Sequence, residues 1–294
     1  MIKKILYFLE GIPVFLLYFF FLAMPPSVAS SIGGKFLSVI GPRLKKNQIA
    51  KKNIKKAFPD KGDKEVDTII SCMWENLGRV AAEYPHLKKF DLYNTSSLKG
   101  LSVKVFGKQY IEQLRDDQKP GIFFSAHLGN WEINAMSAVQ KGLPLTLVYR
   151  KPNNPFSDFL VKKARSHITD SFAAKGKDGA RKAIKVLSQG GHLAMLADQK
   201  MNDGISVPFF GINAMTAPAI AELAIKFNCP IVPARVKRIK GTKFEMRLYP
   251  PIKIPASSSK KERVHKTMVQ VNKIIEAWIR EAPEQWLWVH DRWP

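Results

Sequence analysis

The fold is decided by one stretch of the sequence, Phe123-Phe-Ser-Ala-His127-Leu-Gly-Asn-Trp-Glu132. An apolar, β-forming run ends at His127, a Gly-Asn turn follows, and Glu132 comes five positions after the histidine. This order predicts a buried strand that ends in a histidine, followed by a helix whose first turn carries a carboxylate. We interpret His127 and Glu132 as a candidate catalytic pair.

Strand-like and helix-like segments alternate in the sequence on either side of this stretch. The strand-like runs span residues 101–106, 121–126, 145–149, 193–197 and 231–236. The helix-like segments between most of them span residues 110–115, 131–141, 156–166, 179–188 and 217–227. The alternation predicts an α/β fold in which a largely parallel sheet is flanked by helices. Residues 244–248 and 252–254 are predicted to add strands, and residues 260–280 a long helix.

The N-terminal segment, residues 5–24, is almost entirely apolar and about one bilayer long. It predicts a transmembrane or membrane-anchoring helix, although Glu10 and Pro13 weaken a full span and leave an interfacial helix open. Lys and Arg are far more frequent just after this segment than before it, which places the body of the protein in the cytoplasm. We therefore divide the chain into an N-terminal membrane anchor (1–26), a basic helical region that packs on the catalytic domain and the membrane surface (27–100), and an α/β catalytic domain (101–294).

The composition is strongly basic, with 47 Lys and Arg against 24 Asp and Glu and a net charge of +23. Such an excess implies an anionic partner, which can be nucleic acid, an anionic membrane surface or an acidic substrate. Nucleic acid is not expected, because the sequence carries no helix-turn-helix, zinc-finger or aromatic-basic RNA-binding signature. Residues 47–58 form an amphipathic, lysine-rich pattern that suits an anionic bilayer, and a solvated lysine face on a core-packed helix explains it equally well.

The spacing between His127 and Glu132 is a weak signal alone, because His86 and Asp91 repeat it. Residues five apart on a continuous helix point about 140° away from each other. The Gly-Asn turn after His127 interrupts the regular backbone and allows its side chain to meet that of Glu132, whereas no such turn follows His86. The local backbone therefore separates the candidate site from the chance copy.

Polar residues also follow two other predicted strands. Arg150 follows the run 145–149, and Asp198 and Gln199 follow the run 193–197. Ligands of open parallel sheets bind outside the carboxyl ends of the strands, so these side chains are expected to share one edge with His127. A role without function remains open for two of them, since Arg150 can be an ordinary surface residue and Asp198 can cap the next turn.

These residue types predict a general base without a nucleophile of its own. A neutral histidine held by a carboxylate can take a proton from a hydroxyl. The sequence has no Gly-x-Ser-x-Gly elbow and no cysteine in this stretch, which disfavours a covalent enzyme intermediate. One carboxylate without a second nearby histidine argues against zinc, so we expect no metal. Direct transfer of a group to a substrate hydroxyl is the natural reaction, with Arg150 and nearby lysines facing phosphates or a developing oxyanion.

Motifs along almost the whole chain carry a resemblance to a known family. They are the apolar N-terminal segment, Asn53-Ile-Lys-Lys-Ala-Phe-Pro59, Ala126-His-Leu-Gly-Asn-Trp-Glu132, Tyr149-Arg150 with Asn153-Asn154, Leu196-Ala-Asp-Gln199, Pro208-Phe-Phe-Gly211 through Thr216 and Pro218, and Pro283-Glu-Gln-Trp-Leu-Trp-Val-His-Asp-Arg-Trp293. Together they resemble the bacterial lipid A late acyltransferases (lauroyl and myristoyl transferases) of the lysophospholipid acyltransferase-like superfamily. The glutamate at position 132 favours a saccharide lipid as acceptor, because glycerophospholipid acyltransferases of that superfamily typically have aspartate there.

The resemblance implies transfer of a fatty acyl chain from acyl-carrier protein to a hydroxyl of a lipid A precursor, an acylated and phosphorylated glucosamine disaccharide, on the cytoplasmic face of the bacterial inner membrane. It implies that His127 is the base and Glu132 its charge-stabilising partner, and that Arg150, Asp198, Gln199 and Asn130 bind substrate. Residues 101–294 would be the acyltransferase domain. The expected partners are acyl-carrier protein, the lipid A precursor and an anionic membrane surface, and no cofactor is expected beyond the carrier-protein thioester. The tryptophans, His290 and Arg292 near the C-terminus are expected to pack structurally.

Two alternatives remain open. The first is an acyltransferase that acts on another glycolipid or on a lysophospholipid, with acyl-coenzyme A or acyl-carrier protein as donor. The second is a non-enzymatic, basic, membrane-associated binding protein, which the net charge supports.

Overall fold

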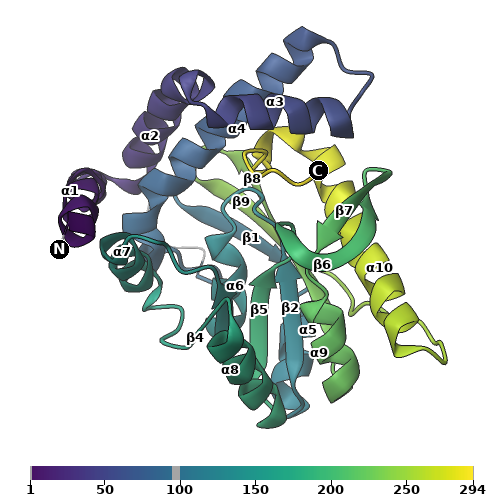
Figure 1. Ribbon diagram of the computed structural model, residues 1–294. Helices are drawn as coiled ribbons and strands as arrows, with labels where there is room; N and C mark the ends of the chain where they lie inside the picture. Colours follow the sequence, from purple (N-terminus) through teal and green to yellow (C-terminus); the bar gives the residue numbers. More distant parts are fainter. Residues whose placement is uncertain (1, 95–99, 294) are drawn as a thin grey trace.

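The core of the protein is a twisted β-sheet, seen in a computed structural model that describes residues 2–94 and 100–293, with side chains from residue 6 onward (Figure 1). In these residues the sheet has seven strands in the order β1-β9-β8-β2-β5-β3-β4. Their bounds are Ser102–Phe106 (β1), Gly121–Ser125 (β2), Leu145–Tyr149 (β3), Phe172–Ala174 (β4), His192–Leu196 (β5), Ile231–Lys240 (β8) and Lys243–Leu248 (β9). All neighbouring pairs are parallel except β8 and β9, which form an antiparallel hairpin.

Helices cover both faces of this sheet. Alternate side chains of β2 enter different clusters: Phe124 packs with Trp278 on one face and Phe123 with Ile133 on the other. The first face is covered by α8 (Lys177–Ser188), α9 (Ala219–Phe227) and α10 (Lys260–Glu281), and the second by α5 (Gln109–Asp116), α6 (Glu132–Val139) and α7 (Pro155–Arg165). A strand apolar on both faces is typical of a parallel α/β sheet. The predicted α/β fold, with a largely parallel sheet flanked by helices, is confirmed.

The N-terminal third is helical and packs on the sheet domain. Its elements are α1 (Ile2–Leu22), α2 (Pro26–Ile40), α3 (Lys46–Ala57), α4 (Asp63–Glu83) and the 3-10 segments Gly41–Arg43 (η1) and Tyr84–Lys89 (η2). The helices α2 and α4 approach so closely that a Cβ on Gly33 would lie 2.6 Å from the carbonyl oxygen of Gly78. Met73 and Trp74 of α4 belong to the same core cluster as Phe124. The division of the chain at residues 26 and 100 stays a prediction.

Two local predictions were incomplete or wrong. Residues 252–254 do not form a strand; they lie in an irregular connection where Pro250, Pro251 and Pro255 remove backbone donors. An antiparallel hairpin outside the main sheet, β6 (Lys200–Phe209) with β7 (Ile212–Thr216), was not predicted. Gly204 and Pro208 lie within β6 and interrupt the strand pattern in the sequence.

The expected transmembrane helix is not found. Within residues 2–94 and 100–293, no helix combines the length and the apolar character needed to cross a membrane. In α1 the charge of Glu10 and the ring of Pro13 lie near the middle, and Glu10 accepts a hydrogen bond from Asn154 at 3.3 Å. That carboxylate therefore helps to dock α1 against the start of α7.

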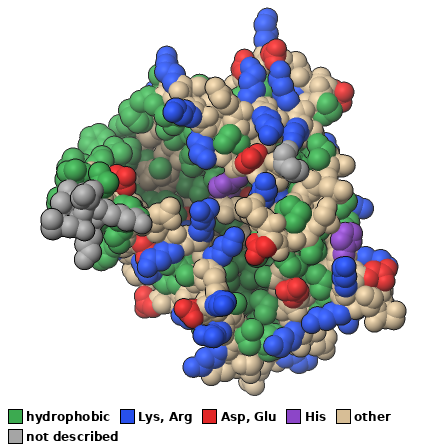
Figure 2. Space-filling view, viewed as in Figure 1, with side chains coloured by type: hydrophobic (Ala, Val, Ile, Leu, Met, Phe, Trp, Pro, Cys, Tyr) green, Lys and Arg blue, Asp and Glu red, His purple; other side chains and the backbone are tan. Residues whose placement is uncertain are grey.

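Large apolar side chains are nevertheless exposed on α1 and α2. On α1 they are Leu6, Phe8, Leu9, Ile12, Val14, Leu16, Leu17, Phe19 and Phe20, and on α2 they are Val28, Ile32, Phe36, Val39 and Ile40. Figure 2 shows them as an apolar projection on one side of the molecule, with a hollow between it and the body. A contiguous apolar surface of this extent is typical of a membrane or protein contact.

Candidate active site

His127 and Asp198 form a hydrogen-bonded pair at the carboxyl ends of two neighbouring strands. In the parallel register of β2 and β5, Ser125 lies opposite Leu196, so His127 and Asp198 each come two residues past the same aligned pair. Nδ1 of His127 lies 2.8 Å from Oδ1 of Asp198, and the backbone N–H of His127 donates to Oδ2 at 2.8 Å. The register of the sheet therefore creates this pair.

The carboxylate of Asp198 is buried and ionised. Burial would raise its pKa, but the charge that His127 carries when protonated, its hydrogen bonds and the indole N–H of Trp286 at 2.7 Å hold the pKa of Asp198 well below its usual range. An ionised carboxylate only accepts hydrogen bonds, so Nδ1 of His127 must carry the proton that it donates. In the neutral ring, Nε2 of His127 then has a free lone pair, as a general base requires.

Gln199 lies between two histidines. Its amide nitrogen is 3.4 Å from Nε2 of His127 and 3.0 Å from Nε2 of His290. Burial, reinforced by the nearby His127, lowers the pKa of His290 to about 4, so this ring is neutral near pH 7. The amide N–H groups of Gln199 can donate to Nε2 of both rings, and the long 3.4 Å contact with His127 is one that a substrate hydroxyl can replace.

Glu132 does not hold His127, contrary to the expected pairing. No hydrogen bond joins these two residues in the described part of the chain; the carboxylate instead accepts from Arg165 at 2.6 and 2.7 Å and from the hydroxyl of Tyr84 at 2.5 Å. Burial would raise the pKa of Glu132, but the charge of Arg165 and these hydrogen bonds lower it overall. Glu132 opens α6, and that first turn directs its side chain toward α7 and η2 rather than toward the histidine. Its catalytic role stays a prediction.

Asn130 is also placed differently from the expectation. It is fully buried, its side-chain amide donates to Glu83 at 2.8 Å, and its side-chain oxygen accepts from the backbone N–H of Glu132 at 3.2 Å. Glu83 is itself paired with the buried Arg238 at 2.5 and 3.0 Å. Both ends of the Asn130 side chain fix the turn after His127, and its binding of substrate stays a prediction.

The C-terminal segment clamps that turn from the other side. Leu128 pairs with Trp286, the N–H of Leu287 donates to the carbonyl of His127 at 3.0 Å, and the N–H of Gly129 donates to the carbonyl of Gln285 at 3.1 Å. Gly129 has φ +58°, and a Cβ there would lie 2.5 Å from a carbonyl oxygen of β8. Glycine is therefore required at this position. The expectation of structural packing for this segment was incomplete, because it also brings Trp286 and His290 to the site.

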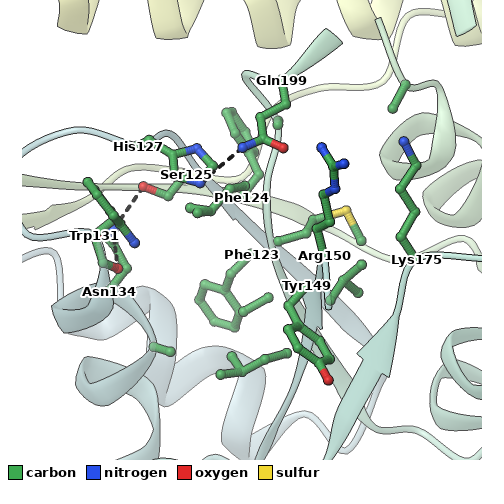
Figure 3. Close-up of a pocket in the computed structure, with 18 of the residues that line it drawn as sticks. Phe123, Phe124, Ser125, His127, Trp131, Asn134, Tyr149, Arg150, Lys175 and Gln199 are labelled. Carbon is green, nitrogen blue, oxygen red and sulfur yellow. Dashed lines mark hydrogen bonds between the residues drawn. The ribbon is translucent and has the colours of Figure 1, made fainter. Parts of the chain in front are cut away.

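A cavity of about 520 Å³ opens beside Nε2 of His127. Figure 3 shows His127, Gln199, Arg150 and Lys175 along one side of it and Phe123 and Tyr149 on the other. Its apolar lining is supplied mainly by the sheet and by α6, and includes Phe123, Leu145, Leu147, Ala194, Ala234 and Ala135. The volume lies within the range of small-molecule pockets, and the combination of an apolar interior with a few polar groups is typical of them.

The predicted site residues thus separate into three groups. Arg150, Gln199 and Glu132 line the cavity, Asp198 lies behind the histidine, and Asn130 holds the loop, to which Glu132 also contributes. The sequence analysis missed the contributions of Trp286, His290, Lys175, Arg165 and Tyr84. The run 286–290, with two tryptophans and one histidine in five residues, was the one available signal for the first two.

The sequence is similar over nearly its whole length to proteins of one known family. Residues 4–294 match the sequence model of the family described as bacterial lipid A biosynthesis acyltransferase. The lipid A biosynthesis acyltransferase of Haemophilus influenzae is 24% identical over 275 residues, covering 90% of this chain and 81% of that protein. The lipid A biosynthesis palmitoleoyltransferase of Escherichia coli is 24% identical over 290 residues, covering 92% and 86%, and the lauroyltransferase of the same organism is 25% identical over 197 residues, covering 64% and 61%.

Among solved structures, the 1-acyl-sn-glycerophosphate acyltransferase of Thermotoga maritima aligns with a TM-score of 0.38 and 12% identity, covering 88% of this chain and 96% of that one. The family match extends over nearly the full length, and it confirms the resemblance inferred from the sequence motifs. The chain belongs to the bacterial lipid A biosynthesis acyltransferase family.

Proposed function

We propose that this acyltransferase moves a fatty acyl chain from the thioester of acyl-carrier protein to a hydroxyl of a lipid A precursor, at the cytoplasmic face of the bacterial inner membrane. The observation that carries the reaction type is the position of His127, whose Nδ1 is held by Asp198 and whose ring borders a cavity lined largely by apolar side chains. A base at the mouth of an apolar cavity suits a reaction between a polar hydroxyl and a long acyl chain.

In this proposal Nε2 of His127 takes the proton of the acceptor hydroxyl while the oxygen attacks the thioester carbonyl. The C–O bond forms, the carbonyl becomes an oxyanion, and the tetrahedral intermediate then collapses with cleavage of the C–S bond. The departing sulfur takes the proton from Nε2, so the enzyme returns to its starting state. Asp198 stays ionised throughout and stabilises the imidazolium that forms in between.

We assign the role of orienting the base to Asp198 rather than to Glu132. The support is geometric, since Asp198 contacts both Nδ1 and the backbone N–H of His127, whereas Glu132 is committed to Arg165 and Tyr84. Glu132 then acts on the reaction indirectly, because it opens the helix that follows the His127 turn. It is a positioning residue.

Cationic and amide groups at the cavity supply the remaining chemistry. Arg150 and Lys175 point in the same direction beside Gln199 (Figure 3). Positive charge preorganised near a reacting carbonyl stabilises a developing oxyanion, and the same groups can bind a phosphate of the acceptor or donor. We propose that Arg150 and Gln199 contact substrate in this way.

We further propose that α1 and α2 lie in the interface of an anionic membrane. Their exposed apolar side chains support this contact, because leaving so many in water is costly. The acceptor, a lipid, would then reach the hollow beside this surface without leaving the bilayer (Figure 2).

The test is an acyl-transfer assay with purified protein in liposomes that contain a tetra-acylated disaccharide bisphosphate. We expect transfer from acyl-carrier protein, slower transfer from acyl-coenzyme A, and little transfer to lysophosphatidic acid. His127→Ala should abolish transfer while the far-ultraviolet circular dichroism stays unchanged, and Asp91→Ala, in the chance copy of the spacing, should behave as wild type. Faster acylation of the lysophospholipid than of the disaccharide would reject the proposed acceptor.

A further inference from the structure

The outer face of α8 is basic over its whole length. The helix turns Gly179, Ala183 and Leu187, at intervals of four residues, toward the core. The opposite side carries Lys177, Arg181 and Lys185 at the same interval, and all three are exposed. Residues four apart lie on the same side of a helix, so these three charges form one stripe.

This charge is not neutralised within the protein. Residues 150–189 hold ten Lys and Arg against three Asp, and the pairs of Lys151 and Lys162 with Asp158 and of Arg165 with Glu132 lie outside α8. Within the described residues, the ion pair on the stripe is that of Arg181 with Asp178 at 3.5 Å, whose side chains are 79% and 98% exposed. A pair so exposed contributes little. Lys177 and Lys185 make no ion pair in the same part of the chain.

The other lysine-rich helix, α3, differs in this respect. Its Lys51 pairs with Asp67 at 3.1 Å and its Lys55 with Asp63 at 2.6 Å, both acids of α4. Acidic residues of α4 therefore neutralise part of the charge of α3, whereas Lys177 and Lys185 of α8 remain available to pair with another molecule. Figure 2 shows Lys and Arg side chains gathered over the part of the molecule where Figure 1 places α7 and α8.

An apolar side chain lies within the basic face. Ile184, which comes three residues after Arg181 and directly before Lys185, is 37% exposed. Large apolar side chains exposed to this extent are concentrated on α1 and α2, and outside those helices the described residues include few others. A basic face with an apolar residue in it suits an acidic, amphipathic protein surface better than a lipid surface alone.

The stripe begins beside the active site. Lys175, two residues before α8, lines the cavity with Arg150. An adjoining groove of about 670 Å³ is lined by Lys163 and Lys182, and Tyr149 lines both the groove and the cavity. A carrier docked on α8 would therefore have a cationic path for the phosphate of its prosthetic arm toward Nε2 of His127.

We propose that the outer face of α8, formed by Lys177, Arg181, Ile184 and Lys185, is the docking surface for acyl-carrier protein. This inference rests on the proposed function, which makes that small acidic protein the donor. Acidic side chains of the carrier pair with the stripe, an apolar residue covers Ile184, and the pantetheine arm enters the cavity past Lys175. The exposed apolar surface of α1 and α2 remains available for the membrane while the carrier is bound.

The test compares two donors with the same acyl group, one attached to acyl-carrier protein and one to pantetheine alone. For the double variant Lys177→Glu with Lys185→Glu, we expect the KM for the protein donor to rise about tenfold or more with little change in kcat. The KM for the pantetheine donor should stay unchanged. Ile184→Ala should raise the KM for the protein donor without any change of charge. Added salt should raise the KM of the wild-type enzyme for the protein donor more than it raises that of the double variant.

The matched control reverses two exposed lysines of α10, Lys261→Glu with Lys273→Glu, which changes the net charge equally on a distant helix (Figure 1). Equal KM values for the protein donor in the α8 and α10 variants would overturn the docking proposal. The proposal would also fail if the α8 variant lost binding to anionic vesicles while its KM for the protein donor stayed unchanged. That result would assign the face of α8 to the membrane. If the kcat/KM of the wild-type enzyme for acyl-pantetheine or acyl-coenzyme A equalled its kcat/KM for the carrier-bound donor, the proposal that acyl-carrier protein is the donor would fail.

Discussion

Nδ1 of His127 lies 2.8 Å from Oδ1 of Asp198, although the two residues are 71 positions apart in the chain. Parallel pairing of β2 with β5 brings them together, and the indole of Trp286 completes the environment of the carboxylate. The expected partner of the histidine, Glu132, lies in a separate buried network. Different experiments follow for the two carboxylates.

Asp198→Asn should reduce kcat roughly 10²- to 10⁴-fold while the protein stays folded. The amide side chain is nearly isosteric with the carboxylate, but its NH₂ group can donate to Nδ1 and favours the tautomer in which Nε2 carries the proton. The measurement is single-turnover transfer, with the melting temperature as a check on folding. Asp178→Asn, at a position 98% exposed, is the control and should keep wild-type kcat. Wild-type turnover by Asp198→Asn would remove Asp198 from the mechanism.

Glu132→Gln should lower the free energy of unfolding by roughly 3–5 kcal/mol, because it leaves Arg165 buried without a counter-charge. Denaturant titration measures this loss. The double variant Glu132→Gln with Arg165→Met should recover part of the stability, since it removes the unpaired charge. Glu75→Gln, which breaks a half-exposed pair with Arg79, should cost about 1 kcal/mol or less. Unchanged stability with a large loss of kcat in Glu132→Gln would instead support a direct catalytic role.

The stability of the protein should fall as the pH drops from about 6.5 toward 4, because the folded protein holds the partly buried His290 in its neutral form. Its folded-state pKa is about 4, against 6.5 for the free side chain. The unfolded chain therefore binds more protons in this pH window, and acid stabilises the unfolded state relative to the folded one. His86, His167 and His192, whose pKa values are also lowered by burial, add to the slope. His290→Gln should flatten the dependence by up to roughly 3 kcal/mol over the window. Urea titrations across this pH range measure the free energy of unfolding. If His290→Gln left its pH dependence unchanged, the neutral, partly buried state of His290 would be contradicted.

Replacing Leu9, Leu16 and Phe20 of α1 by Ser should weaken binding to anionic vesicles by at least about tenfold. These side chains are 50–66% exposed, so the substitutions remove apolar contact with lipid and leave the core unchanged. Vesicle flotation measures the effect. Ile239→Ser, at an exposed position on β8, is the matched control and should bind as wild type. Equal flotation of both variants would reject α1 as a membrane contact.

The sequence predicted most of the sheet because its strands are apolar on both faces and are separated by helical periodicity. The bounds of β3 were predicted to the residue, and His127 was placed correctly at the end of β2. Because the carboxyl ends of parallel strands lie at one edge of the sheet, the sequence also predicted that Asp198 and Gln199 lie near His127. What failed was side-chain direction: Glu132 and Asn130 are close to His127 in sequence, but the turn points both of them into buried networks.

Contacts between distant segments were the other gap. The pairing of Trp286 with Asp198 and of Glu83 with Arg238 depends on how α4 and the C-terminal segment pack, which no local pattern encodes. The hairpin β6–β7 was missed for a related reason, since its strands pair with each other and follow no βαβ alternation. Tertiary packing decided each of these cases.

The bridge between Leu128 and Trp286 makes the active site a late product of folding. It joins residues more than 150 positions apart, and contacts of such long range close only after the intervening chain is ordered. A partly folded chain would carry His127 without the segment that orients its turn and its aspartate. Acyl transfer should therefore disappear before the sheet melts, so that turnover reports the docking of residues 285–290 rather than the survival of the core.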